Sequence, residues 1–78
     1  MQMTLDQIGR GNKGIVSEII ESHISSKLLE LGFISGSMVE VVFEAPFKDP
    51  IAVELNGSMI SLRLDEAATI LIEKEDKP

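Results

Sequence analysis

The sequence predicts a mainly β fold in which five short strands form a small closed or nearly closed barrel. Three observations predict it: apolar and polar residues alternate in several segments, turn-forming residues separate these segments, and the chain has only 78 residues. Alternation with a period of two is typical of a strand with one buried face. Because closing a sheet removes exposed strand edges, we expect a barrel that occupies one domain, residues 1–78.

The first predicted strand, residues 14–21, follows a glycine-rich turn at residues 9–14. Its apolar residues fall in adjacent pairs, Ile15–Val16 and Ile19–Ile20, instead of alternating singly. A β-bulge or a strong bend would produce this pattern, because one extra residue shifts the alternation. Ahead of the strand, we expect two apolar side chains to anchor the N-terminal segment to the core: Leu5 and Ile8.

The predicted α-helix covers residues 25–31. The hydroxyl group of Ser25 or Ser26 can accept a hydrogen bond from a free backbone N–H at the start of the helix. Gly32 suits the left-handed conformation that often follows the last turn. The apolar side chains at helical spacing, which we expect to face the core, are Ile24, Leu28 and Leu31.

A second strand is predicted at residues 38–44, where alternation is regular. Its two glutamates, Glu40 and Glu44, are expected to point towards solvent. The side chains expected on its inner face are Val39, Val41 and Phe43.

The C-terminal third predicts a hairpin, a helical turn and a last strand. Residues 51–55 and 58–62 alternate on either side of Asn56–Gly57. This dipeptide is a strong hairpin signal because both residues accept a positive φ. Residues 65–68 indicate a short helical turn, and residues 69–73 indicate the fifth strand.

Composition excludes several classes of protein. The chain has no cysteine, so it has no disulfide, thiolate nucleophile or thiolate metal ligand. Its net charge is −6 and its seven Lys and Arg residues are scattered, so we expect no nucleic-acid partner. No apolar run approaches the roughly 20 residues that span a bilayer, and the N-terminus lacks a signal peptide's features. We expect a cytoplasmic protein without direct membrane insertion, with residues 74–78 as a solvated tail.

Three segments together resemble the ferrous iron transport protein A (FeoA) family. Residues 27–37 (KLLELGFISGS) resemble its signature, a basic residue and leucines followed by leucine-glycine and a turn that ends in glycine. Residues 45–51 resemble its proline loop and Asp-Pro pair, and residues 60–70 resemble its C-terminal strand, turn and strand. The resemblance runs from about residue 5 to 73. It departs at Lys27, where arginine is commoner, and at Ser35, where proline is commoner.

The resemblance implies an SH3-like barrel and a role beside the membrane ferrous iron transporter FeoB, which carries a cytoplasmic GTPase domain. The protein would then be a cytoplasmic accessory or regulatory binding protein for ferrous iron uptake, and not an enzyme. An alternative is a metal-responsive regulatory domain, because a similar SH3-like domain ends many iron-dependent repressors. Those repressors carry a helix-turn-helix domain ahead of the barrel, which makes this alternative the second choice.

No catalytic, cofactor or metal site is predicted. The glycine-rich residues 9–14 lack the phosphate-loop pattern, and no serine is accompanied by a base and an acid in a recognisable order. His23, the only histidine, has no metal-binding neighbour at helical spacing and is interpreted as a loop or cap residue. Asp65 and Glu66 suit a helix N-terminus better than a cation site, which needs six or more oxygens.

Two apolar features are candidates for binding a partner protein. Leu28 and Leu29 lie about 100° apart around the helix, so one can face the core while the other lies near the edge, unless both are buried. Phe47 is an aromatic residue in a loop bounded by prolines, which limit its conformational freedom. Alternatively, Phe47 caps the open end of the barrel. The candidate partner-binding residues are Leu28, Leu29, Phe47, Lys48, Asp49 and Pro50. Weak homo-oligomers through strand edges or short helices remain a further possibility.

Overall fold

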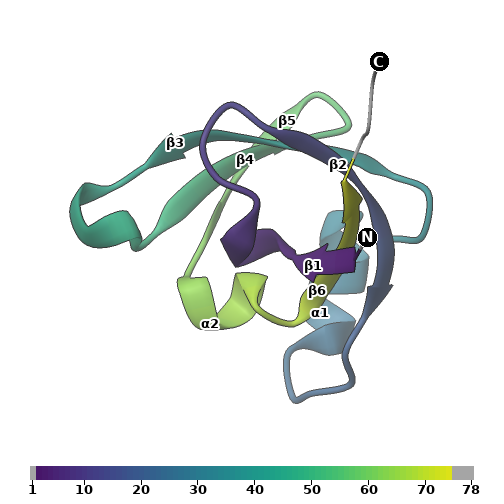
Figure 1. Ribbon diagram of the computed structural model, residues 1–78. Coiled ribbons are helices and arrows are strands. Elements are labelled where there is room, and N and C mark those ends of the chain that lie inside the picture. Colours follow the sequence, from purple (N-terminus) through teal and green to yellow (C-terminus); the bar gives the residue numbers. More distant parts are fainter. Residues whose placement is uncertain (1, 75–78) are drawn as a thin grey trace.

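The computed structural model describes residues 2–74 and contains one antiparallel sheet of six strands in the order β1-β6-β2-β3-β4-β5 (Figure 1). The strands are β1 Gln2–Thr4, β2 Lys13–Ile19, β3 Met38–Glu44, β4 Ile51–Leu55, β5 Ser58–Leu62 and β6 Ile70–Lys74. The helical segments are η1 Leu5–Gln7, α1 Ser25–Leu31, η2 Pro46–Lys48 and α2 Leu64–Ala67. Of the predicted solvated tail, residue 74 ends β6, and residues 75–78 lie outside the described residues.

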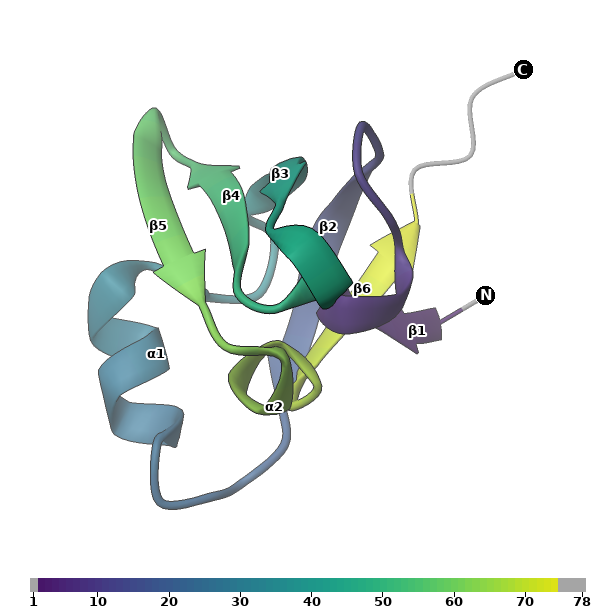
Figure 2. The same ribbon diagram turned by 90° about the vertical axis from the view of Figure 1, so that its left-hand side faces the viewer.

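The predicted mainly β architecture is confirmed, with one strand more than predicted. Among the described residues, the end strands β1 and β5 do not pair with each other, so the barrel is not closed by hydrogen bonds and the expected removal of strand edges is wrong. The additional strand, β1, pairs with β6 and places Met3 opposite Ile72. Three residues are too few to show an alternating pattern, so the sequence does not reveal this strand. The sheet curls around the core, and α1 and α2 lie below its β3–β4–β5 part in both views (Figures 1 and 2).

The core is formed by apolar side chains from nearly every element. The prediction that Leu5 and Ile8 anchor the N-terminal segment is confirmed, because both are buried. Phe33, which follows α1, is also fully buried. The buried apolar residues are Leu5, Ile8, Val16, Leu28, Phe33, Val39, Val41, Ile51, Val53, Leu55, Leu62, Ala67, Ile70 and Ile72.

Two β-bulges interrupt the alternation along the sheet. In β2 the register with β6 shifts between Val16 and Glu18, which confirms the bulge predicted from the paired apolar residues. In β3 the register with β4 shifts between Val41 and Phe43. The prediction that Phe43 faces the core is therefore wrong. The extra residue turns Phe43 outward, beside Ala52, and places Glu44 opposite the buried Ile51.

The predicted bounds of α1 are confirmed, but its cap and its buried face differ from the prediction. Ile24 is the N-cap residue, and the Ser25 hydroxyl donates to the Ser22 carbonyl (2.8 Å) instead of capping the helix. Gly32 has the predicted left-handed conformation, with φ 112°. Leu31 is exposed, because Phe33 folds back below the helix and its ring fills the core.

The predicted β4–β5 hairpin is confirmed, and a short helix follows it. Asn56 and Gly57 have φ values of 53° and 86°, as the tight turn requires. The helix α2 begins at Leu64, one residue before the predicted turn. The Glu66 carboxylate accepts a hydrogen bond from the Arg63 N–H (2.9 Å), which closes the first turn of α2.

Candidate functional site

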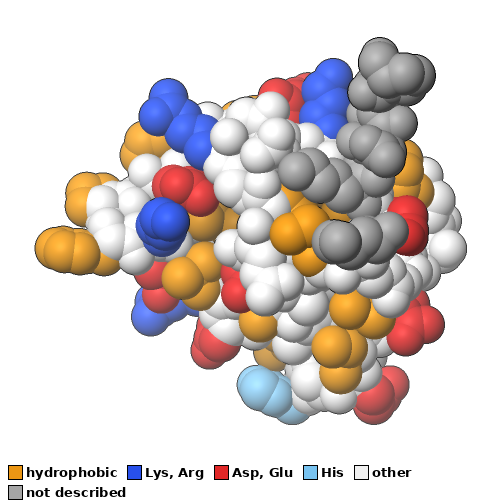
Figure 3. Space-filling view, in the orientation of Figure 1, with side chains coloured by type: hydrophobic (Ala, Val, Ile, Leu, Met, Phe, Trp, Pro, Cys, Tyr) orange, Lys and Arg blue, Asp and Glu red, His pale blue; other side chains and the backbone are white. Residues whose placement is uncertain are grey.

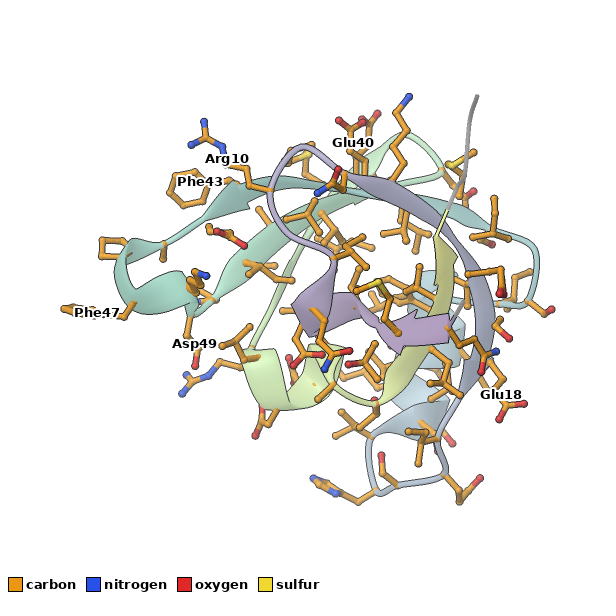
Figure 4. All side chains as sticks on the ribbon, in the orientation of Figure 1. Arg10, Glu18, Glu40, Phe43, Phe47 and Asp49 are labelled. Atoms are coloured by element: carbon orange, nitrogen blue, oxygen red, sulfur yellow. The ribbon has the colours of Figure 1, made fainter. Side chains whose placement is uncertain are left out.

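Phe47 projects from the tip of the β3–β4 connection (residues 45–50, here called the Phe47 loop). Its side chain is 98% exposed, and Figure 4 shows it pointing away from the rest of the molecule. It therefore does not cap the barrel. Phe47 and Lys48 both have positive φ, 66° and 65°, which is unfavourable for residues with a Cβ atom. Backbone strain of this kind persists only where surrounding contacts hold the chain in place.

Hydrogen bonds on both sides hold the Phe47 loop in this conformation. Across its base, the Ala45 N–H donates to the Pro50 carbonyl (3.0 Å), and the Lys48 N–H donates to the Ala45 carbonyl (2.7 Å). The Asp49 carboxylate accepts a hydrogen bond from the Leu64 N–H at the start of α2 (3.1 Å). Asp49, predicted as a partner contact, therefore also anchors the loop to the body of the protein.

Phe43 and Arg10 extend this surface, and neither was predicted as a site residue. Phe43 is 52% exposed because of the β3 bulge. The Gly11 N–H donates to the Val41 carbonyl (2.7 Å), which brings the turn that carries Arg10 next to the bulge. Figure 4 shows Arg10 and Phe43 on the same side, and Figure 3 shows apolar and basic side chains at this end with acidic side chains among them. The adjacent apolar residues Val41 and Val42 were the available sequence signal for the bulge, the same signal that predicted it in β2.

The two leucines predicted as partner contacts have different environments. Leu28 is 1% exposed and packs in the core, so its side chain is not available to a partner. Leu29 is 51% exposed on the outer side of α1. Leu31 and Ile34 are also exposed at the C-terminal end of the helix. These three exposed residues, Leu29, Leu31 and Ile34, are called the α1 patch below.

A shallow hollow lies between the β2–α1 connection and α2. It is lined by His23, Arg63, Asp65 and Glu66, among others. The positively charged guanidinium group of Arg63 disfavours binding of a metal cation in this hollow, because like charges repel. Within residues 2–74, no three His, Cys, Asp or Glu side chains are grouped so that they could hold a metal ion. None of the helices formed by these residues is long and apolar enough to cross a membrane.

A small curled sheet of six antiparallel strands with short helical connections is the architecture of a small β-barrel domain, and a solved relative with this fold is described as an SH3 domain protein. The chain belongs to the FeoA domain family, whose model matches residues 3–74. Both the resemblance to this family and the SH3-like fold are therefore confirmed.

Related proteins place the family in ferrous iron transport. The chain is 31% identical over 72 residues to an Fe(2+) transport protein A/Fe(2+) transporter FeoB fusion protein of Porphyromonas gingivalis. That match covers 91% of this chain, but the chain spans only 8% of the length of the fusion protein. FeoA proteins are small accessory domains, and the fusion shows that a FeoA domain and a FeoB transporter can be parts of one chain.

Solved structures share the fold over nearly the whole chain. A FeoA-like protein from Clostridium acetobutylicum has a TM-score of 0.91 and 32% identity, covering 99% of this chain and 91% of that chain. FeoA of Stenotrophomonas maltophilia, complexed with zinc and described as a procaryotic SH3 domain protein, has a TM-score of 0.84 and 26% identity, covering 97% and 99%. A manganese-dependent transcriptional repressor has a TM-score of 0.84 at 18% identity, covering 95% and 42%, which shows the fold alone.

Proposed function

We propose that this protein is a cytoplasmic accessory module of ferrous iron uptake that acts by docking on the cytoplasmic part of the transporter FeoB. The observation that carries the proposal is Phe47, an aromatic side chain that is 98% exposed on a hydrogen-bonded loop. The fusion relative supports it, because joining two proteins in one chain gives their binding surfaces a high effective concentration for each other.

The Phe47 loop suits an anchor that enters a pocket of the partner. Aromatic side chains dominate the binding energy of many interfaces. The loop backbone is already held by the hydrogen bonds of Ala45, Lys48 and Asp49, so docking costs little conformational entropy. Phe43 and Arg10 would widen the contact around the anchor, and Lys48 and Arg10 favour an acidic partner surface.

The α1 patch is a second contact surface in this proposal. Leu29, Leu31 and Ile34 expose apolar area on and just after one short helix. Because Leu28 beside them is buried in the core, the helix presents its outer leucines in a fixed position. The module acts by contact and contributes no catalytic group.

The test is binding of the purified protein to FeoB in nanodiscs, comparing Phe47→Ser and Leu29→Ser with the wild type. We expect each substitution to weaken binding about tenfold, with an unchanged melting temperature, because both side chains are exposed. Ile20→Ser is the matched control, since Ile20 is also exposed but lies outside both surfaces. Wild-type affinity for both variants would exclude these surfaces, and no binding by the wild type would refute the docking.

A further inference from the structure

The strand β5 is an open edge of the sheet that lacks the usual protection against pairing. It ends the strand order, and Figure 2 shows it at one side of the sheet. Natural edge strands are commonly protected by charged residues, prolines, bulges, shortness or a covering helix or loop. The five residues of β5, SMISL, carry no charge and no proline, although 26% of the chain is charged. The register of β5 with β4 is unbroken, whereas β2 and β3 are bulged.

The hairpin geometry identifies which backbone groups of β5 point outward. In a hairpin with a two-residue turn, the residues that flank the turn, here Leu55 and Ser58, exchange hydrogen bonds. Hydrogen-bonded and non-hydrogen-bonded pairs then alternate along the ladder. Met59 and Ser61 therefore direct their N–H and C=O groups away from β4. Within the described part of the chain, β5 makes no backbone hydrogen bond outside its ladder with β4.

We propose that a second copy of this chain adds its own β5 to this edge, antiparallel and related by a two-fold axis at Ile60. In this register Met59 of each copy lies opposite Ser61 of the other. The outward N–H of each of these residues can then donate a hydrogen bond to the outward C=O of the residue opposite it. Ile60 lies opposite Ile60 in a non-hydrogen-bonded pair, where side chains approach most closely.

The side chains of β5 favour its own copy as the occupant of the edge. Ile60 is partly buried against the core, so pairing would let two such side chains cover each other on the inner face. On the outer face, Met59, which is 61% exposed, would cover Ser61 of the second copy. No charged side chain of either strand would face another, whereas like charges placed opposite each other destabilise a sheet.

Each copy carries a net charge of −6, so two copies repel each other over a distance even though the paired strands are neutral. Salt screens this repulsion between exposed charges. The pairing is therefore expected to strengthen with ionic strength, which is the opposite of an association through ion pairs.

The first experiment is sedimentation velocity of the full chain over about a hundredfold range of concentration, at low and at moderate salt. We expect a reversible monomer–dimer equilibrium whose dissociation constant falls when salt is added. A protein that stays monomeric at every concentration would overturn the proposal, and so would dimers that weaken with salt.

A substitution at Met59 tests the hydrogen bonds of the edge directly. Met59→Pro removes one outward N–H, and proline is tolerated at such edge positions because that N–H is not part of the β4 ladder. We expect the dissociation constant of the dimer to rise at least about tenfold. Met59→Ala is the matched control: it shortens the side chain, keeps the N–H and should still dimerise. Dimerisation of Met59→Pro with wild-type affinity would refute the register.

Amide hydrogen exchange of the wild-type protein locates the interface without a variant. The amides of Met59 and Ser61 should become more protected as protein concentration rises. Protection that appears instead in the α1 patch or the Phe47 loop would overturn the proposal. Protection of β5 only after FeoB is added would assign the edge to a strand of the transporter and would equally exclude the second copy. None of these outcomes depends on docking through the Phe47 loop.

Discussion

Leu28 and Leu29 are neighbours in the chain but lie in opposite environments. About 100° of rotation around α1 separates them, which takes Leu28 into the core and leaves Leu29 half exposed. The same side chain therefore supports folding at one position and is available for contact at the next.

This difference predicts opposite results from one substitution. Leu28→Ala should lower the free energy of unfolding by about 2–5 kcal/mol, because it leaves a cavity among Phe33 and its buried neighbours. Leu29→Ala should change it by less than about 0.5 kcal/mol and should weaken FeoB binding instead. Urea denaturation of both variants measures the first quantity. Equal destabilisation of the two would show that Leu29 is also part of the core.

At the scale of elements, connections outside the regular strands position the candidate site. The bulge in β3 turns Phe43 outward, and the hydrogen bond from the Leu64 N–H to the Asp49 carboxylate ties the Phe47 loop to α2. The Arg63 guanidinium lies 4.0 Å from the same carboxylate, but the pair is exposed and contributes little on its own. The hydrogen bond is the stronger of the two tethers.

Removing this tether should loosen the loop. Asp49→Ala should cost about 0.5–1.5 kcal/mol of unfolding free energy, since the Leu64 N–H loses its acceptor, and it should also weaken FeoB binding because Phe47 is less well held. Thermal unfolding and the nanodisc assay measure the two effects. Asp65→Ala is the control, because Asp65 is an exposed acidic residue of α2, the helix whose Leu64 N–H bonds to Asp49. Full FeoB affinity in Asp49→Ala would show that loop rigidity is unimportant.

At the scale of the whole molecule, the two ends of the sheet are protected in different ways. β1 covers β6, but it is only three residues long and brings Met3 against the core. β5, at the other end, is longer and uncharged. Short edges resist pairing with other chains, whereas longer neutral ones invite it, so of the two end strands in residues 2–74 β5 is the one suited to the proposed self-association.

Deleting residues 1–4 should test the contribution of β1. We expect a loss of about 1–2 kcal/mol, or roughly 4–16 °C in melting temperature, because β6 loses its ladder with β1 and the Met3 contact but keeps its ladder with β2. Deleting residues 75–78 is the comparison, since the sequence predicts a solvated tail there. An unchanged melting temperature after the first deletion would show that β1 adds nothing to the fold.

Local chemistry in the sequence was sufficient to predict most of the elements. Apolar residues in alternating or paired patterns predicted five strands, Asn56–Gly57 predicted the hairpin, and Gly32 predicted the end of α1, because each depends on preferences of adjacent residues. The sequence marked Phe47 as a candidate contact in a loop between prolines but left open whether its ring caps the barrel, and only the structure shows that the ring is exposed.

Tertiary contacts decided the rest. Leu31 is exposed because Phe33 fills the space below α1, and Phe43 is exposed because β4 pairs with β3 in a shifted register. β1 is a strand only because β6 lies beside it, and β5 is an edge only because the sheet ends there. The strand pairings depend on residues far apart in the chain, and of these outcomes the β3 bulge alone has a local signal, the adjacent residues Val41 and Val42. The physical reason is that burial and strand pairing are properties of the packed sheet, whereas turn and helix signals are properties of the chain itself.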